Sequence, residues 1–331
     1  MALRSVVASC FLALVALAPA SQRATGQANA DEPAQTFAGM QTLELAPPKS
    51  AALDQALQTH NYVAAETLLL AEIASDPHSH RAARLLGFIG GVYFLNHDYL
   101  HAAIAWKKSE AITALTPQVR FSLAMAYIRI GHSDWADSVL EALAAQDTRN
   151  ALYPYWLGRL AYDAHSYNGA IQHFKTAIDL APAMARAYDN LGLCYYYQNQ
   201  NDLALANYNK AIELNLNSPH PSAWPYLNLA TTLDFLNKPA EAEANLREAI
   251  RLDTTIAPAH FLLGTIFEKT GRTDAAISEF DEAGRLDPNY AEPHFALART
   301  YNKLGRKAEA QQEVQTYLRI HNAAKAATTP R

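Results

Sequence analysis

The feature of this sequence that most limits its fold is an internal repeat with a period of about 34 residues. The pair Leu157-Gly158 returns one period later as Leu191-Gly192. Seven equivalent positions, called the anchors here, form two series with this spacing: Ile89, Leu123, Leu157 and Leu191, then Leu229, Leu263 and Leu297. The gap between the two series exceeds one period by four positions, so a short insertion lies around Ser218–Pro221.

Three further columns accompany each anchor. A small residue follows it directly: Gly90, Ala124, Gly158, Gly192, Ala230, Gly264 and Ala298. An alanine stands thirteen positions after it: Ala102, Ala136, Ala170, Ala204, Ala242, Ala276 and Ala310. A large apolar residue stands seventeen after it: Trp106, Leu140, Phe174, Tyr208, Leu246, Phe280 and Val314. A weaker copy with Ala52, Ala65 and Leu69 precedes the first anchor.

The spacing within one repeat predicts two helices. Apolar residues recur every three or four positions on both sides of a turn such as Ile130-Gly131-His132-Ser133, which indicates two amphipathic helices of about 12–14 residues in a hairpin. The small columns allow the paired helices to approach closely. A single hairpin cannot bury both of its apolar faces, so neighbouring hairpins must stack into a solenoid.

These columns closely resemble the signature of the tetratricopeptide repeat (TPR) family, in which Leu-Gly, Tyr, Ala, a large aromatic residue, Ala and Pro are spread over about 34 residues. Residues 187–215 and 257–288 match most fully, whereas Ala161, Leu233 and Phe267 depart from the tyrosine column. The resemblance covers residues 50 to 322. It implies an all-α fold, an α-solenoid of about eight helical hairpins that form a right-handed superhelix.

The N-terminal part of the chain, up to residue 49, differs from the rest and predicts export. Arg4 precedes an apolar stretch from Val6 to Ala18, and Ala18-Pro19-Ala20 offers a cleavage site, which is typical of a signal peptide over residues 1–20. A flexible leader is expected over 21–49, followed by a first arm of about five repeats (50–217), a second arm of three (218–322) and a tail (323–331). The protein is therefore expected to be periplasmic or extracellular.

The two cysteines fit this interpretation. Cys10 ends a stretch, Val7–Cys10, that superficially resembles a lipoprotein motif, but it precedes most of the apolar run, so lipidation is disfavoured. Cleavage would remove Cys10 and leave Cys194, which we interpret as a buried small apolar residue. No intramolecular disulfide is then expected.

The sequence offers little for catalysis or for metal binding. It contains no nucleophile elbow, P-loop, HExxH or paired CxxC motif. His97 and His101 are four apart, but His97 falls in a predicted turn, and His260 and His294 occupy equivalent columns that suggest packing. The net charge of −5 gives no reason to expect nucleic acid as a partner. We therefore predict no enzyme activity, no cofactor and no metal site.

The face that could bind a partner is the concave wall which, in proteins of this family, the first helix of each repeat lines. Positions two before and five after the anchors are expected to point into this groove, and the predicted peptide-binding residues are Phe121, Tyr155, Arg159, Tyr162, Arg186, Tyr196, Phe261, Phe295 and Arg299. Apolar surface flanked by charge is typical of interaction sites. The alternative is that these rings only pack against neighbouring helices.

The predicted function is a non-enzymatic scaffold that binds peptide or protein segments in this groove. A clamp for a C-terminal carboxylate is disfavoured, because Asn190 and Asn228 match one of its elements but no lysine stands two before any anchor. The alternative function is an accessory protein that binds carbohydrate or another polymer through the groove aromatics. No stable membrane span is expected, and the sequence does not predict the oligomeric state.

Overall fold

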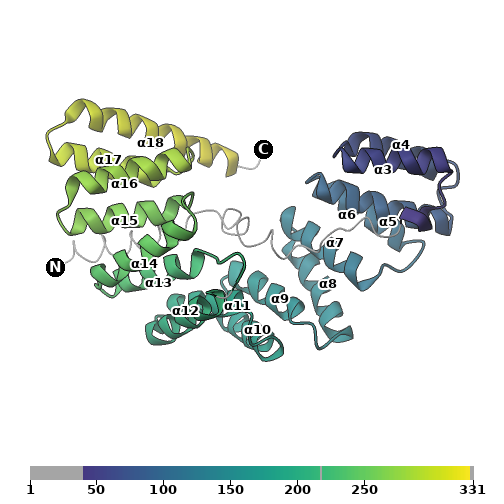
Figure 1. The fold of residues 1–331 in the computed structure, drawn as a ribbon, viewed down its shortest axis with the longest axis horizontal. Coiled ribbons are helices and arrows are strands. Elements are labelled where there is room, and N and C mark those ends of the chain that lie inside the picture. The colour runs from purple at the N-terminus through teal and green to yellow at the C-terminus, as the bar shows by residue number, and fades with distance from the viewer. Residues whose placement is uncertain (1–39, 217, 329–331) are drawn as a thin grey trace. The chain divides into compact units, whose positions relative to one another are not determined.

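The chain forms only helices in the part that the computed structural model describes, residues 40–216 and 218–328 (Figure 1). Within these residues there are 16 α-helices and a short 3-10 helix, η1 (Met40–Leu43), and there is no β-strand. The first eight helices are α3 (Pro47–Gln58), α4 (Tyr62–Ala74), α5 (His80–Leu95), α6 (Tyr99–Glu110), α7 (Pro117–Arg129), α8 (Ser133–Gln146), α9 (Leu152–Asp163) and α10 (Tyr167–Leu180). The others are α11 (Ala185–Tyr197), α12 (Asn201–Asn215), α13 (Trp224–Phe235), α14 (Pro239–Leu252), α15 (Ala257–Lys269), α16 (Thr273–Leu286), α17 (Ala291–Lys303) and α18 (Lys307–Thr328).

The helices pair into hairpins, from α3–α4 to α7–α8 and from α11–α12 to α17–α18, which confirms the all-α solenoid. The chain divides into two compact units between Leu160 and Ala161, within α9. In the N-terminal unit, α4 packs on α5 and α6 on α7, so each hairpin covers the next. In the C-terminal unit, α12 packs on α13, α14 on α15 and α16 on α17. Among the first helices, α13 also touches α11 and α15.

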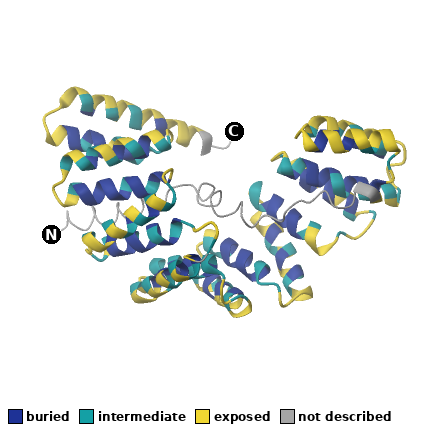
Figure 2. Cartoon of the chain, viewed as in Figure 1, coloured by how far each residue is buried: buried dark blue, intermediate teal, exposed yellow. Residues whose placement is uncertain are grey.

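Buried segments run along the helices throughout the described part of the chain (Figure 2), and the columns read from the sequence belong to this core. All seven anchors are buried, and the alanine column is almost completely inaccessible to solvent. The large column is buried from Trp106 to Phe280, whereas Val314 in α18 is 39% exposed. Val314 belongs to the last hairpin, and no further hairpin among the described residues covers it. Burial of repeated apolar stripes between neighbours is therefore what holds the array together.

The small column and the large column pack directly on each other. A methyl group added at Gly192 would lie 2.6 Å from the ring of Tyr208, and one at Gly264 would lie 2.7 Å from the ring of Phe280. The sequence carries a matching rule: glycine accompanies Trp106, Phe174, Tyr208 and Phe280, whereas alanine accompanies Leu140, Leu246 and Val314. An aromatic ring needs the space that glycine leaves, because interiors are close-packed.

The turn inside each hairpin has one backbone conformation. A residue eight positions after the anchor adopts positive φ, for example His97 (60°), His165 (58°), Asn199 (58°) and Gly131 (80°). The next amide then donates back to the carbonyl five positions earlier, as from His132 to Tyr127 at 2.9 Å, and this closes the helix end. Glycine, asparagine and histidine tolerate positive φ better than other residues. The positive φ at this position therefore accounts for His97 and His165 in the turn column.

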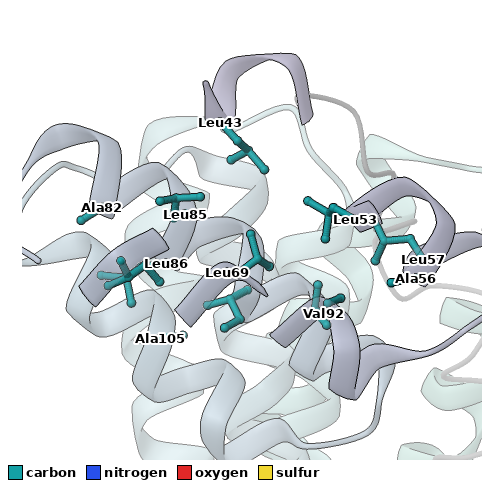
Figure 3. Close-up of a cluster of buried hydrophobic side chains, with 13 residues drawn as sticks. Leu43, Leu53, Ala56, Leu57, Leu69, Ala82, Leu85, Leu86, Val92 and Ala105 are labelled. Atoms are coloured by element: carbon teal, nitrogen blue, oxygen red, sulfur yellow. The ribbon is translucent and has the colours of Figure 1, made fainter. Parts of the chain in front are cut away.

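The array begins before the residue that the sequence predicted. The leader was expected to extend to residue 49, but Met40–Leu43 forms a 3-10 helix and α3 begins at Pro47. Leu43 joins Leu53, Leu57 and Leu69 in the core of the first hairpins (Figure 3). Burial of the apolar Leu43 side chain stabilises the folded conformation of this segment. The predicted signal peptide and the leader up to residue 39 lie outside the described residues.

The insertion and the C-terminus also differ from expectation. The sequence placed a boundary between arms at 217/218, but α12 and α13 pack on each other within the same unit. The buried side chain of Asn215 holds the insertion: it donates to the carbonyl of Ser222 at 2.7 Å and accepts from its amide at 3.0 Å. At the C-terminus α18 continues to Thr328 through the predicted tail, because the alanine-rich segment favours helix.

Candidate functional site

Three of the predicted groove residues are buried in the N-terminal unit. Phe121 on α7 and Tyr155 on α9 are buried, Tyr155 being only 1% exposed, and Arg159, four positions after Tyr155 on α9, is also buried. The Phe121 ring meets Tyr153 at the start of α9 with a centroid distance of 5.7 Å, and Tyr155 meets Trp156 at 5.7 Å. For Phe121 and Tyr155 the packing alternative therefore describes the structure, and they offer no exposed ring.

Two predicted aromatic residues lie near the C-terminal end of the array. Phe261 on α15 contacts Phe280 of its own hairpin and Tyr290, which directly precedes α17, with centroid distances of 5.7 and 5.4 Å. Phe295 occupies the same column one repeat later and is 52% exposed, with Tyr317 of α18 at 5.4 Å. Phe295 is more exposed because no further hairpin follows it within the described residues.

The two remaining predicted aromatics come together in the C-terminal unit. Tyr162 at the end of α9 and Tyr196 on α11 both contact Tyr197, with centroid distances of 5.9 and 5.5 Å. Tyr167, the first residue of α10, stacks on Tyr197 at 5.1 Å and 2°, and it also meets Tyr162 at 5.8 Å. Phe235, at the end of α13, meets Tyr196 edge-on at 6.0 Å. We call these five residues the tyrosine cluster.

The tyrosine cluster is half-buried and carries no ionic group at neutral pH. Its four tyrosines are partly exposed, and Phe235 is 44% exposed. Burial raises the pKa of the Tyr167 phenol, with a smaller contribution from Tyr197, so this hydroxyl remains protonated. Edge-on and offset contacts between rings of this kind stabilise each other by about 0.5–1.5 kcal/mol per pair. The cluster is therefore a firm apolar surface with polar rims.

Sequence reasoning found two members of the cluster and missed three. Tyr196 and Tyr162 stand five after their anchors, in the column that was expected to face the groove. Tyr197 and Phe235 stand six after theirs, and Tyr167 stands ten after its anchor. The run Tyr195-Tyr196-Tyr197 at the end of α11 was an available signal, because a continuous aromatic run must place at least one ring away from the core stripe.

A second set of side chains lies further along the C-terminal unit and is charged, and four of its five members stand five or six after their anchors. Lys269 on α15 pairs with Asp234 on α13 at 2.6 Å, and Lys303 on α17 pairs with Glu268 on α15 at 2.6 Å. Arg299 on α17 also pairs with Glu268. We call these five residues the charged ladder. Its two carboxylates pair with three basic groups between successive first helices, which leaves one positive charge in excess, and each exposed pair contributes only about 0–1 kcal/mol.

Arg186, near the start of α11, is the remaining predicted residue. It is half-buried, and this burial lowers the pKa of its guanidinium to about 10, so the group remains charged at neutral pH. Its backbone carbonyl accepts from Asn190 at 2.7 Å. Asn228, the second asparagine at a clamp position, donates to Asp189 at 2.9 Å in the interior. Both asparagine amides therefore bond within the fold.

The histidines that attracted attention in the sequence have structural surroundings. His260 Nδ1 lies 2.7 Å from the Glu279 carboxylate, and His294 Nδ1 lies 2.6 Å from that of Glu313, so each links the two helices of its own hairpin. Among residues 40–216 and 218–328, no group of three His, Cys, Asp or Glu side chains is placed to hold a metal ion. Nor is any helix in that part of the chain long and apolar enough to cross a membrane.

Comparisons with known proteins agree with this architecture. Tetratricopeptide repeat models match residues 121–185 and 227–291, 183–255, and 267–328, which together span 121–328. A protein of Haemophilus influenzae described as a lipoprotein NlpI homolog is 31% identical over 108 residues. That match covers 33% of this chain and 32% of the relative, so the chain spans about a third of the relative's length.

Solved structures share the fold at low sequence identity. A tetratricopeptide repeat protein from Parabacteroides merdae superposes with a TM-score of 0.63 at 16% identity, covering 84% of this chain and 99% of that one. PilW, described as a type IV pilus biogenesis factor, gives 0.54 at 20% identity over 60% of this chain and 90% of its own. The repeat columns, the stacked hairpins and the matching models lead to one conclusion: the chain belongs to the tetratricopeptide repeat family.

Proposed function

We propose that this protein is a non-enzymatic scaffold that binds segments of partner proteins, and that the tyrosine cluster is its main contact surface. The observation that carries this proposal is the gathering of five partly exposed rings from three successive hairpins. Tyrosine is enriched at protein interfaces because it combines a large apolar ring with a polar end and loses little conformational entropy. Most of the binding energy of an interface comes from a few such residues.

The other predicted groove residues take a supporting role in this proposal. Arg186 supplies charge near the start of α11, the helix that ends with Tyr196 and Tyr197. Arg299 lies further along the array, where it pairs with Glu268, and Phe261 and Phe295 extend the apolar surface toward the last hairpin. Phe121, Tyr155 and Arg159 do not take part, because they are buried. Binding of an extended or helical segment to the first helices of the hairpins follows the general modes of peptide recognition.

We place this function outside the cytoplasm, in the periplasm or the cell envelope. The support is the N-terminal pattern of residues 1–20, which is typical of a secretory signal. The relative from Haemophilus influenzae is described as a lipoprotein, which agrees with an envelope location. Fractionation followed by N-terminal sequencing tests this part: loss of residues before Ser21 supports it, and a cytoplasmic protein that retains Met1 contradicts it.

Crosslinking in intact cells followed by mass spectrometry tests the scaffold and its contact surface together. The wild type is compared with the double variant Tyr167→Ala/Tyr197→Ala and with Trp135→Ala, which removes a 49% exposed ring on α8, outside the proposed contact surface. We expect reproducible protein crosslinks in the wild type, their loss in the double variant and their retention in Trp135→Ala. Unchanged crosslinks in a double variant with wild-type circular dichroism would contradict the assignment of the surface.

A further inference from the structure

A row of amide side chains borders the tyrosine cluster. Gln198 follows α11 directly, and its Nε2 donates to Oδ1 of Asn168 on α10 at 2.7 Å. Gln200, just before α12, donates from its Nε2 to Oε1 of Gln198 at 3.2 Å. Gln198 is adjacent in sequence to Tyr197, and Asn168 is adjacent to Tyr167, the two stacked rings. We call Asn168, Gln198 and Gln200 the amide row.

The amide row has more hydrogen-bond donors than its internal bonds use. Each side-chain amide carries two N–H donors and one carbonyl acceptor. The two bonds within the row use one donor of Gln198 and one of Gln200, together with the carbonyls of Asn168 and Gln198. Asn168 and Gln200 are exposed, so the remaining donors can reach a ligand. The phenol hydroxyl of Tyr167 lies 3.2 Å from Nδ1 of His165, so it is already engaged within the fold and the surplus donors are those of the amides.

The eight side chains of the cluster and the row combine ring surface, surplus donors and no charge. A ligand that matches them has apolar faces, carbonyl acceptors and few N–H groups of its own. A polyproline II segment has these properties, because proline carries a carbonyl but no N–H, and its backbone makes no internal hydrogen bonds. Such segments dock on aromatic-lined surfaces and lose little entropy, since the conformation is already formed.

We propose that the tyrosine cluster and the amide row bind an uncharged, proline-rich segment of a partner protein in the polyproline II conformation. This rests on the proposed scaffold function and narrows it to one ligand chemistry. Other chemistries match less well. An acidic or basic peptide finds no opposite charge among these eight side chains. The last two hairpins, by contrast, carry Arg272 and Arg306 at the turn position that Gln200 occupies between α11 and α12.

Direct binding of a blocked, fluorescently labelled decaproline tests this proposal with the full chain. Fluorescence anisotropy is recorded for the wild type, Tyr167→Ala/Tyr197→Ala, Asn168→Ala/Gln198→Ala and the matched control Asp274→Ala, which alters the same turn column as Asn168 in a later hairpin. A blocked peptide of alternating glycine and serine and a soluble neutral glucan serve as competitors. Circular dichroism confirms that each variant is folded.

We expect saturable binding of decaproline that neither competitor displaces. Loss of the two tyrosines should weaken it by about tenfold, and loss of the two amides by about threefold to fivefold. Asp274→Ala should bind as the wild type does. The proposal is overturned if decaproline does not bind, or if the tyrosine variant and the amide variant both bind it with wild-type affinity. Displacement of decaproline by the glucan also overturns it. If decaproline fails while crosslinking in cells still depends on Tyr167 and Tyr197, the scaffold function stands and only the ligand chemistry is wrong.

Discussion

The turn between α11 and α12 and the turn between α15 and α16 have the same backbone but different side chains. Asn199 and Gly271 both adopt positive φ, at 58° and 78°. In both turns the following amide closes the helix end, from Gln200 to Tyr195 at 2.9 Å and from Arg272 to Phe267 at 2.8 Å. The conformation of the hairpin is therefore independent of the surface that the turn presents.

The surfaces of these two turns suit different purposes. Arg272 lies over the ring of Phe267 at 4.2 Å and pairs with Glu243 at 2.6 Å, so its charge is satisfied within the array. Arg306 repeats this over Tyr301 at 4.4 Å. The earlier turn carries the amide row beside Tyr197 instead. The repeated columns therefore determine the backbone of each hairpin. The positions between them can carry uncharged side chains in one hairpin and internal ion pairs in another.

The largest effect on stability should come from the buried contact between the small and the large columns. We expect Gly192→Ala to lower the free energy of unfolding by about 2 kcal/mol, because its methyl group would overlap the Tyr208 ring. Tyr208→Leu in the same chain should recover a large part of this loss, since alanine already accompanies leucine in two other hairpins. Urea denaturation of the two single variants and the double variant gives the coupling energy.

Independent effects would contradict the pairing. If the losses in Gly192→Ala and Tyr208→Leu simply add, the small and large columns are not matched to each other. Ala230→Gly beside Leu246 is the control, and it should destabilise the chain, because the space for a ring is left unfilled there.

The next largest effect should come from the inserted segment. Asn215→Ala removes two hydrogen bonds that the buried side chain makes to the backbone of Ser222. We expect a loss of about 1–1.5 kcal/mol, because the amide and carbonyl of Ser222 lose their partner. Urea denaturation measures it, with the exposed Asn209→Ala on α12 as the control. A value equal to that of the control would mean that the insertion does not depend on this side chain.

A smaller, pH-dependent effect should separate the charged turn from the uncharged one. The hydrogen bond from Arg272, with help from Arg247, lowers the pKa of Glu243 to about 2 from its ordinary 4.5. Because the folded value is the lower one, the stabilisation is present above pH 4.5 and is lost as the pH falls toward 2. Arg272→Gln should therefore lower the urea midpoint at pH 7, and the difference from wild type should shrink toward pH 2.

The uncharged turn provides the comparison for this experiment. Gln200→Ala, at the equivalent position, should show the same difference from wild type at pH 7 and at pH 3. A pH-independent deficit in Arg272→Gln would contradict the role of the ion pair and leave only the contact with Phe267.

The smallest effect should come from exchanging the turn residues. Asn199→Gly should raise the free energy of unfolding by about 0.5 kcal/mol or less, because glycine adopts positive φ without steric cost, and Gly271→Asn should lower it by a similar amount. Matched denaturation curves measure both changes. A loss in Asn199→Gly well above that size would show that the asparagine side chain, rather than the backbone conformation, matters at this turn.

Much of the frame could be predicted from the sequence because it repeats. The anchors and the alanine column mark positions that neighbouring hairpins bury in the same way each time, so one interpretation applies seven times over. The turn at Gly131 was placed correctly for the same reason. The ends of the array were less predictable: Leu43 is buried against the first hairpins from outside the repeat, and α18 extends through helix propensity rather than through the repeat.

The site was predictable only in part. Tyr162 and Tyr196 occupy one column, so periodicity alone placed both of them among the predicted contact residues. Tyr167 is the first residue of α10, and it stacks on Tyr197, the last residue of α11 in the next hairpin. No single column of the repeat describes such a pair. The burial of Phe121 and Tyr155 was missed because they share columns with partly exposed rings, and only the local packing of α7 and α9 distinguishes them.

Site-specific photocrosslinking in intact cells tests the central claim, that this frame binds partners at the tyrosine cluster and not at the charged turns. A photoreactive phenylalanine analogue is placed at Asn168 in one variant and at Asp274 in another; both residues are exposed and occupy the same column. We predict strong crosslinks to a partner protein from position 168 and few from position 274. Equal crosslinking from both positions, or crosslinks from position 274 alone, would contradict the account.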